Sequence, residues 1–405
     1  MYFYYERRLL IKVILVCLFE LFLKTIKNSS KRQNGSPSVL KKNEIIVIMK
    51  IEKVFYKEGF MKVTIQDVAK EAGVSITTVS RVINKNYPVK EETKKKVEEA
   101  IQKLNFTPNP LARGLIINQT LTVGVLVPGI ANLFFPAVIK GIEKHLKKKG
   151  FTLFLCDTEG NPQEEKKMVK TLLDRRVDGL IVMDPRKENI DNGFFEGVAK
   201  EHPLILINGE HKGVRCNFIL SDQEMGTYEA LRYLIQLGHK KIAFLRGGNS
   251  YSYDLKEEVY LEVMKQSHKT VEEDSILLIQ EGNSMESVNM SRQVVYERLQ
   301  RPDPPTALFA CNDWMALGAI QGAKEAGQKV PQDLSIIGFD NTLMAELSSP
   351  RLTTIEQNMY ELGKTAAHRL LTIMKQEQED VVYQKITIPT QLIIRESTNQ
   401  YRKKG

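Results

Sequence analysis

The chain has 405 residues, 42% of them hydrophobic and 26% charged, which is the composition of an ordinary globular protein with two or three domains. Four scattered cysteines (Cys17, Cys156, Cys216 and Cys311) form no CxxC pair, which argues against a disulfide framework or a zinc site. The net charge of the whole chain is +9. Residues 1–60 hold 12 Lys/Arg against 5 Asp/Glu (+7) and residues 61–120 hold 10 against 6 (+4), so residues 121–405 carry a net charge of −2. The N-terminal end therefore has the basic charge typical of phosphate contact.

We interpret residues 1–60 as an extension that is not part of the natural protein. The apolar run at 9–22 contains two charged residues and is shorter than the ~20 residues of a membrane-spanning helix. No small-residue cleavage site of a signal peptide follows it. The triplet Lys57-Glu58-Gly59 back-translates to a purine-rich sequence that resembles a ribosome-binding site, so we expect translation to start at Met61. A membrane anchor is the alternative interpretation.

Residues 61–107 predict a headpiece of three helices. Thr64 can cap the first helix together with Asp67, and Gly73 can end it because glycine enters the left-handed conformation without steric cost. Ser75 can cap the second helix. Apolar residues recur at helical spacing in the three segments: Ile65, Val68 and Ala72, then Val79 and Val82, then Val97, Ala100, Ile101 and Leu104. The first two helices and their tight turn predict a helix-turn-helix, whose second helix lies in the DNA major groove.

The outer face of the predicted second helix carries residue types that can contact DNA. Arg81 can make a bidentate contact to guanine, Thr77 can bond a base or a phosphate, and Ile76 can touch a thymine methyl group. In the alternative interpretation, Arg81 only neutralises a phosphate and Ile76 packs on a neighbouring helix. The candidate DNA-binding residues of the headpiece are Thr64, Ser75, Ile76, Thr77, Thr78, Ser80, Arg81 and Asn84.

The segments TIQDVAKEAGVSITTVSRVIN and EETKKKVEEAIQKLNFTPNPLARGL resemble the headpiece of the lactose/galactose repressor (LacI/GalR) family, and the resemblance continues through nearly all of 61–398. In that family the stretch equivalent to 108–120 is a hinge helix that folds on operator DNA and inserts a leucine from the minor groove. The resemblance assigns this wedge to Leu115, with Ala112 beside it and Asn109 as the N-cap. A plain linker is the alternative, and Gly114 favours it.

Residues 121–398 alternate short β-branched runs with helical patterns, and the alternation restarts after residue 227. The expected strands lie in TVGVLVPG, FTLFLCDT, VDGLIVMDP, HPLILING, IAFLRGG, PTALFACND and DLSIIGFDN. This pattern predicts two successive α/β halves with parallel sheets and a cleft between them. The resemblance implies a periplasmic-binding-protein-like body of two subdomains, with three crossover strands, an effector in the cleft and dimerisation. Residues 399–405 are a short basic tail.

Several polar and aromatic residues match positions where members of the family contact effector. They are Asn132, Phe134 and Phe135 after the first expected strand, Asn312 and Asp313 in ACND, and Asp340 in IIGFDN. A carboxylate can accept hydroxyl groups and an aromatic ring can stack on a ligand ring. The alternative is that Asn312 and Asp313 cap the following helix and that both phenylalanines belong to the core.

The chain departs from the family at other cleft positions. Where members commonly carry an effector-binding arginine, followed three residues later by glycine and an aromatic, this chain has Glu257, Tyr260 and Leu261. Ser284 stands where some members have an aromatic that covers the ligand. These departures argue against an ordinary monosaccharide or nucleobase, and leave open another small molecule, a protein co-regulator or the lack of any effector.

The predicted function is a sequence-specific DNA-binding transcriptional regulator, with a repressor as the favoured form. We expect a cytoplasmic homodimer on a pseudo-palindromic operator, modulated by a ligand in the cleft, with no cofactor, metal or membrane partner. An enzyme is disfavoured because no nucleophile with a base, metal cluster or phosphate loop occurs; Gly247-Gly248-Asn249-Ser250 lacks the G-K-[ST] of a Walker A loop. The alternative, a solute-binding protein for transport, requires an export signal and does not account for the helix-turn-helix.

Overall fold

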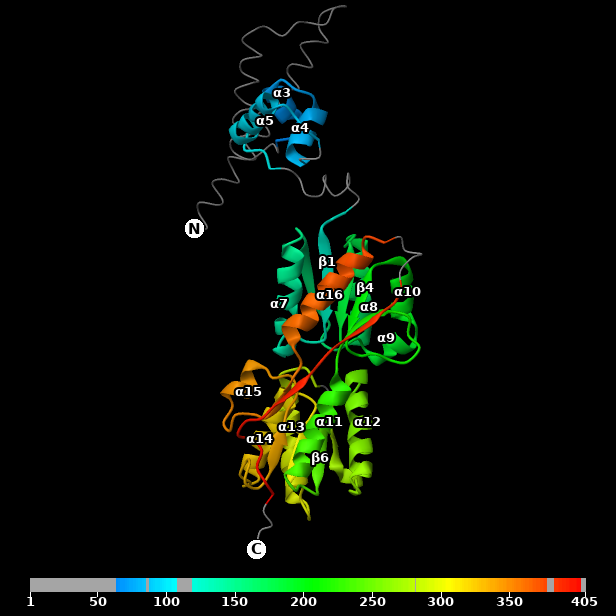
Figure 1. Ribbon diagram of the computed structural model, residues 1–405, viewed down its shortest axis with the longest axis vertical. Helices are drawn as coiled ribbons and strands as arrows, with labels where there is room; N and C mark the ends of the chain where they lie inside the picture. The colour runs from blue at the N-terminus through cyan, green and yellow to red at the C-terminus, as the bar shows by residue number, and fades with distance from the viewer. Residues whose placement is uncertain (1–62, 85–86, 108–118, 281, 377–381, 402–405) are drawn as a thin grey trace, which may run out of the picture. The chain divides into compact units, whose positions relative to one another are not determined.

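The computed structural model describes residues 63–84, 87–107, 119–280, 282–376 and 382–401 (Figure 1). The chain divides into two compact units, Met1–Asn109 and Pro110–Gly405. The expectations for residues 1–60 and for the hinge residues Asn109, Ala112 and Leu115 concern parts of the chain outside the described residues. Among the described helices, none combines the length and the hydropathy that a membrane span needs.

The headpiece consists of three helices, as predicted: α3 (Ile65–Ala72), α4 (Ile76–Asn84) and α5 (Glu91–Lys103). Its core is formed by Val68, Val79 and Val97, one from each helix, and all three side chains are completely buried. Such a small core depends on every helix contributing its apolar face, because a domain of this size buries little apolar surface elsewhere.

The predicted helix ends of the headpiece are also confirmed. The backbone N–H of Thr64 donates to the carboxylate of Asp67 at 2.8 Å, and the Thr64 hydroxyl accepts from the Asp67 backbone N–H, which completes a capping box. Gly73 ends α3 in the left-handed conformation with φ of 67°. The Ser75 hydroxyl accepts from the Thr78 backbone N–H at 3.1 Å and starts α4. These local bonds fix the angle at which α4 leaves the turn.

The described residues of the body, Pro110–Gly405, form two parallel sheets and one antiparallel pair. The first sheet has six strands in the order β11-β5-β4-β3-β1-β2, and the second has four in the order β7-β6-β8-β9. The antiparallel pair is β10-β12. The strands span Thr122–Val127 (β1), Thr152–Asp157 (β2), Gly179–Met183 (β3), Leu204–Ile207 (β4), Asn217–Ser221 (β5), Ile242–Arg246 (β6), Ile276–Leu278 (β7), Ala307–Ala310 (β8), Ser335–Ile337 (β9), Thr354–Glu356 (β10), Lys385–Ile388 (β11) and Gln391–Ile393 (β12).

Helices cover both faces of each sheet. We call the six-stranded sheet with its helices the first lobe and the four-stranded sheet with its helices the second lobe. The helices of the first lobe are α7 (Phe134–Lys147), α8 (Pro162–Asp174), α9 (Lys187–Asp191), α10 (Phe194–Glu201) and α16 (Met359–Ile373). Those of the second lobe are α11 (Gln223–Gln236), α12 (Tyr251–Gln266), the 3-10 helix η1 (Glu273–Ser275), α13 (Glu286–Gln300), α14 (Asp313–Glu325) and α15 (Leu343–Leu347).

Alternate residues of the first-lobe strands enter two separate cores. In β1, Val123 and Val125 pack with α7 and α16, whereas Leu126 packs with α8 and α10 on the opposite face. Strands buried on both faces carry nearly continuous apolar runs, which explains TVGVLV in β1 and LILI in β4. The predicted α/β body with two halves and parallel sheets is therefore confirmed.

The chain passes between the lobes three times, which agrees with the expectation from the family resemblance. The crossings follow β5, β10 and β11: the first leads to α11, the second to α16 and the third to β12 (Figure 1). Three short connections of this kind let one lobe turn against the other while each sheet stays intact.

In the first lobe, α7 and α16 cross closely through two glycines. A Cβ atom added at Gly363 would lie 2.0 Å from the carbonyl oxygen of Val138, and one added at Gly141 would lie 2.2 Å from that of Tyr360. The absence of a side chain at both positions therefore lets the two backbones touch, and even one methyl group would force the helices apart.

We expect Gly363→Ala to lower the free energy of unfolding by about 2–3 kcal/mol, because the methyl group meets backbone atoms that cannot give way. Urea unfolding followed by circular dichroism measures this change. Gly197→Ala in α10 is the matched control, because a Cβ there meets nothing within 4 Å. It should leave stability unchanged or raise it by up to ~1 kcal/mol. Equal effects of the two substitutions would contradict the close helix crossing.

Candidate functional site

The outer face of α4 is exposed as the sequence predicts. Ile76 is 46% exposed and takes no part in the headpiece core, so the alternative that it packs on a neighbouring helix is wrong. Thr77 and Arg81 are exposed, and Ser80 is half-buried. The helix thus presents apolar, hydroxyl and cationic groups on the side opposite Val79, which are the chemical types that recognise base edges and phosphates.

Five of the predicted DNA-binding residues also take part in local hydrogen bonds. Thr64 takes part in the capping box of α3. Ser75 caps α4, and its hydroxyl lies 2.9 Å from that of Thr78. The Asn84 amide donates to the Ser80 hydroxyl at 3.2 Å, one turn along α4. Contacts of these residues with DNA remain a prediction.

Arg81 lies against an aromatic ring that the sequence analysis did not single out. Its guanidinium carbon is 5.2 Å from the centre of the Tyr87 ring, and none of the ion pairs formed by the described residues involves Arg81. Tyr87 is 65% exposed, so its ring and the guanidinium of Arg81 are both open to a partner. A signal was available in the sequence, because an aromatic shortly after a DNA-reading arginine can form a cation–π contact.

Five of the six residues that match effector-contact positions lie together in the body, and the sixth, Asp313, does not line the same cavity. Asn132, Phe134 and Phe135 of the first lobe and Asn312 and Asp340 of the second lobe line one small cavity of about 30 Å³ between the lobes. Residues from distant parts of the chain therefore meet at one cleft, as the sequence predicted. Whether each of them contacts a ligand remains a prediction.

These residues are also held by contacts within the protein. The Asn132 amide donates to the side-chain oxygen of Asn283 across the lobes at 3.0 Å. Asn312 accepts from the Met315 backbone N–H at 2.9 Å, which caps α14. Phe134 and Phe135 belong to the first-lobe core. The structural alternatives are therefore confirmed for Asn312 and for both phenylalanines, which nevertheless line the cleft. For Asp313 the expected cap is wrong, because Asn312 is the N-cap of α14 and the Asp313 carboxylate binds Thr342 and Thr354.

The two aspartates of the second lobe differ in their positions. Asp313 is fully buried and accepts hydrogen bonds from Thr354 at 2.6 Å and from Thr342 at 2.7 and 2.9 Å, without lining the cavity. Burial raises its pKa to about 6. Asp340 lines the cavity and accepts from the Gln357 amide at 2.5 Å. Burial raises the pKa of Asp340 well above its usual value, and the neighbouring Asp313 raises it further.

A buried lysine supplies the cation of the cleft. Lys256 is 3% exposed, its ammonium is 4.1 Å from the centre of the Phe339 ring, and it lines the cavity. It favours the ionised form of Asp340 and lowers the pKa of that carboxyl. Glu257, at the position of the family's arginine, instead forms an ion pair with Arg246 and does not line the cavity. The cleft therefore keeps a positive charge, on Lys256, although the family's arginine is replaced.

The other departures from the family pattern have ordinary structural roles. The hydroxyl of the fully buried Tyr260 donates to the carbonyl oxygen of Ile242 at 2.8 Å, and Leu261 is exposed. The backbone N–H of Ser284 donates to the Ser287 hydroxyl at 3.1 Å, before α13. In the part of the chain that the structure describes, no group of three or more His, Cys, Asp or Glu side chains is arranged to hold a metal ion.

We expect Lys256→Met to destabilise the protein in a pH-dependent way. The pKa of Asp340 in the folded protein lies above its value of 3.8 in the unfolded chain. Protonated Asp340 therefore contributes fully to the stability of the fold below pH 3.8, and this contribution is lost as the pH rises through the folded pKa. Lys256 limits this loss because it stabilises the carboxylate. The substitution should lower the free energy of unfolding by about 3 kcal/mol at pH 8 and by much less at pH 5, measured by urea unfolding.

Lys364→Met is the control for this prediction. Its side chain is 47% exposed and its ammonium pairs with Glu361 one turn away on α16, so the same loss of charge should have a small effect at both pH values. An equally large effect of Lys256→Met at pH 5 and pH 8 would show that Lys256 stabilises the cleft by packing alone.

Comparison with known protein families assigns both parts of the chain. Residues 64–109 match the family of bacterial regulatory proteins named after lacI, and residues 231–398 match the periplasmic binding protein-like domain. The chain is 36% identical over 342 residues to the HTH-type transcriptional regulator DegA of Bacillus subtilis, which covers 84% of this chain and 99% of that protein.

Two further relatives show the same extent of similarity. Catabolite control protein A of Priestia megaterium is 35% identical over 341 residues, with 84% of this chain and 100% of that protein covered. The HTH-type transcriptional repressor PurR of Aliivibrio salmonicida is 38% identical over 321 residues, with 78% and 94% covered.

Solved structures agree with this assignment. The Lac repressor dimer bound to operator and the anti-inducer ONPF aligns with a TM-score of 0.75 and 30% identity, over 84% of this chain and 100% of that chain. A LacI family transcriptional regulator from Enterococcus faecium with bound ribose aligns with a TM-score of 0.59 and 30% identity, over 69% and 100% of the two chains. The chain therefore belongs to the LacI family and is a DNA-binding transcriptional regulator.

Proposed function

We propose that the protein is a repressor that binds a pseudo-palindromic operator as a homodimer. The observation that carries this proposal is the exposed outer face of α4, where Ile76, Thr77 and Arg81 point away from the headpiece core. A helix of this kind fits the major groove, and a two-fold symmetric dimer presents two copies of it to half-sites separated by whole helical turns of DNA.

The similar structures support the dimer and the operator as partners. The Lac repressor, all of which aligns with 84% of this chain, was solved as a dimer bound to operator. In the proposed complex, Thr77, Ser80 and Arg81 read bases or phosphates, and the paired hinge stretches enter the central minor groove with Leu115 as the wedge. We place this activity in the cytoplasm, where the DNA is.

We propose further that a small polar molecule in the cleft changes operator affinity. The Lac repressor was solved with an anti-inducer and the Enterococcus faecium regulator with ribose, which supports a ligand site in this fold. Here the cavity offers the amides of Asn132 and Asn312, the carboxyl of Asp340 and the ammonium of Lys256. A ligand acts on the operator only if it binds one arrangement of the lobes better than the other. This function requires no cofactor and no catalytic residue.

The transport alternative has no support among the relatives. DegA, PurR and the solved Lac repressor are regulators of transcription, and the match to the lacI family covers the headpiece that a transport protein would lack.

Selection of bound duplexes from a random DNA pool by the full chain tests the proposed function. We expect enrichment of one pseudo-palindrome with two matching half-sites, because each half-site meets the same surface of α4. Failure to enrich any duplex at low salt, or enrichment of a single half-site without symmetry, would contradict a dimeric operator-binding protein.

We expect Arg81→Ala to weaken binding to the selected duplex by about 1–3 kcal/mol and to relax sequence preference at one base pair in each half-site. Affinities for duplexes with single base-pair changes measure this effect. Lys95→Ala removes an equal charge from an exposed position on α5 and should leave all sequence preferences unchanged. Uniform losses on every duplex for Arg81→Ala would show that Arg81 contacts phosphate only.

We expect Tyr87→Ala to weaken binding by about 0.5–1 kcal/mol at the base pair that Arg81 reads, because the ring holds the guanidinium in place. Tyr87→Phe keeps the ring and should retain specificity. In an Arg81→Ala background the loss of the ring should have no further effect, which a double-mutant cycle measures. Full additivity of the two losses would show that Tyr87 and Arg81 act independently.

A further inference from the structure

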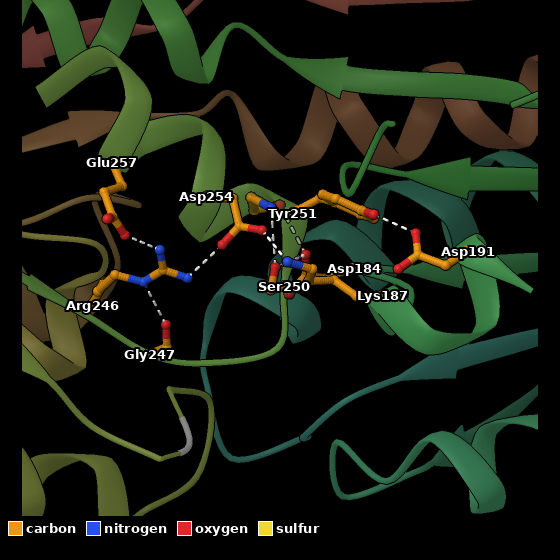
Figure 2. A network of polar contacts seen from close by, with 10 residues as sticks. Asp184, Lys187, Asp191, Arg246, Gly247, Ser250, Tyr251, Asp254 and Glu257 are labelled. Atoms are coloured by element: carbon orange, nitrogen blue, oxygen red, sulfur yellow. Dashed lines mark hydrogen bonds and ion pairs between the residues drawn. The ribbon is translucent and has the colours of Figure 1, made fainter. Parts of the chain in front are cut away.

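The start of α12 in the second lobe rests against the first lobe at Asp184, which follows β3, and at α9. Asp184 and Ser252 are also part of the lining of the small cavity. Figure 2 shows Asp184 next to Ser250, Tyr251 next to Asp191, and Asp254 between Lys187 and Arg246. The three of these pairs that join the lobes are 60, 66 and 67 positions apart in the sequence, so only the relative placement of the two lobes brings them together.

Asp184 is the buried centre of this contact. One of its carboxylate oxygens accepts the hydroxyls of both Ser250 and Ser252, each at 2.8 Å. All three side chains are buried, and the Ser250 hydroxyl also accepts from the Ser252 backbone N–H at 3.1 Å, which caps α12. Hydrogen bonds to a charged acceptor are among the stronger ones in proteins, so separating the lobes here removes two of them together.

Two ionic or polar contacts flank Asp184 on its outer side. Lys187 forms an ion pair with Asp254, and the Tyr251 hydroxyl donates to Asp191. The Lys187 ammonium also lies 4.8 Å from the centre of the Tyr251 ring. These outer contacts are partly exposed and border a second inter-lobe cavity of about 530 Å³, so water and salt reach them and weaken them.

Arg246 belongs to the same network but stays within the second lobe. It pairs with Asp254 at 2.6 Å and with Glu257 of α12 (Figure 2). Its role is to hold the Asp254 carboxylate toward Lys187, whereas its contact with Glu257 touches nothing in the first lobe. The network thus contains an ion pair between the lobes, Lys187 with Asp254, and one within the second lobe, Arg246 with Glu257. Each can be removed by substitution without removing the other.

We propose that Asp184 is a positioning residue that holds the two lobes in their closed arrangement by binding Ser250 and Ser252. The outer contacts of Lys187 and Tyr251 assist it. We call the contact of Asp184 with Ser250 and Ser252 the clasp. The inference rests on the proposed regulation by lobe movement and adds that the clasp determines which fraction of the protein is closed before any ligand binds. A ligand that favours the open arrangement has to break this clasp, whereas one that favours closure adds to it.

The distance between the lobes tests the clasp without DNA or effector. Spin labels are attached at Lys170→Cys on α8 and Lys265→Cys on α12, which are both exposed. Pulsed electron–electron double resonance then measures the distance between the lobes in the full chain. Cys17 and Cys156 are replaced by serine, and the buried Cys216 and Cys311 are left in place.

Ser252→Ala removes one hydroxyl and leaves the cap of α12 intact, because that cap uses the Ser250 hydroxyl. Asp184→Asn keeps the size of the side chain and tolerates the left-handed backbone at this position, where φ is 44°. We expect each change to raise the ratio of open to closed protein roughly tenfold. The double variant should show less than the product of the two effects, because both act on one contact.

Glu257→Gln is the matched control, because it breaks an ion pair of the same network inside the second lobe. It should leave the distance distribution as in the unchanged chain. Distance distributions that are unchanged in both Ser252→Ala and Asp184→Asn would overturn the proposal, as would an equal shift caused by Glu257→Gln. Because no DNA is present, these outcomes are independent of whether the proposed operator binding is correct.

Discussion

The burial of Val79 between Val68 and Val97 is the contact on which the reading of DNA depends. A helix with one buried face has the opposite face fixed toward solvent, and in α4 that face carries Ile76 and Arg81. The capping bonds at both ends of the turn hold the helix at its angle. The headpiece can therefore present the same chemical groups to DNA each time, which sequence-specific binding requires.

The body adds a second level of control through contacts between its lobes. The amide of Asn132 donates to Asn283 across the cleft, and Asp184 at the same cleft accepts hydrogen bonds from two serines. Both contacts join the two lobes in this structure, whereas the apolar cores of the two lobes are separate. Lobe movement therefore changes polar contacts and leaves the cores intact. A small ligand can alter such a balance, because it competes with or completes a few hydrogen bonds.

Local patterns made most of the fold predictable from the sequence. The capping box of Thr64, the glycine that ends α3 and the apolar runs of β1 and β4 act over a few residues and were identified correctly. The short strands β7 and β10 have three residues each and carry no such pattern. In the cleft, the sequence could not show that Lys256 and not Glu257 faces the cavity, because one step along a helix turns a side chain by about 100°. The clasp at Asp184 depends on tertiary packing alone.

The most direct test of the central claim is dimethyl sulfate protection of guanine N7 on the duplex that the full chain selects. Methylation at N7 reports the major groove, where we place α4. The account predicts protection of guanines at symmetric positions in both half-sites when the protein is bound. Binding that leaves every guanine N7 open to methylation would show that α4 does not enter the major groove and would contradict the account.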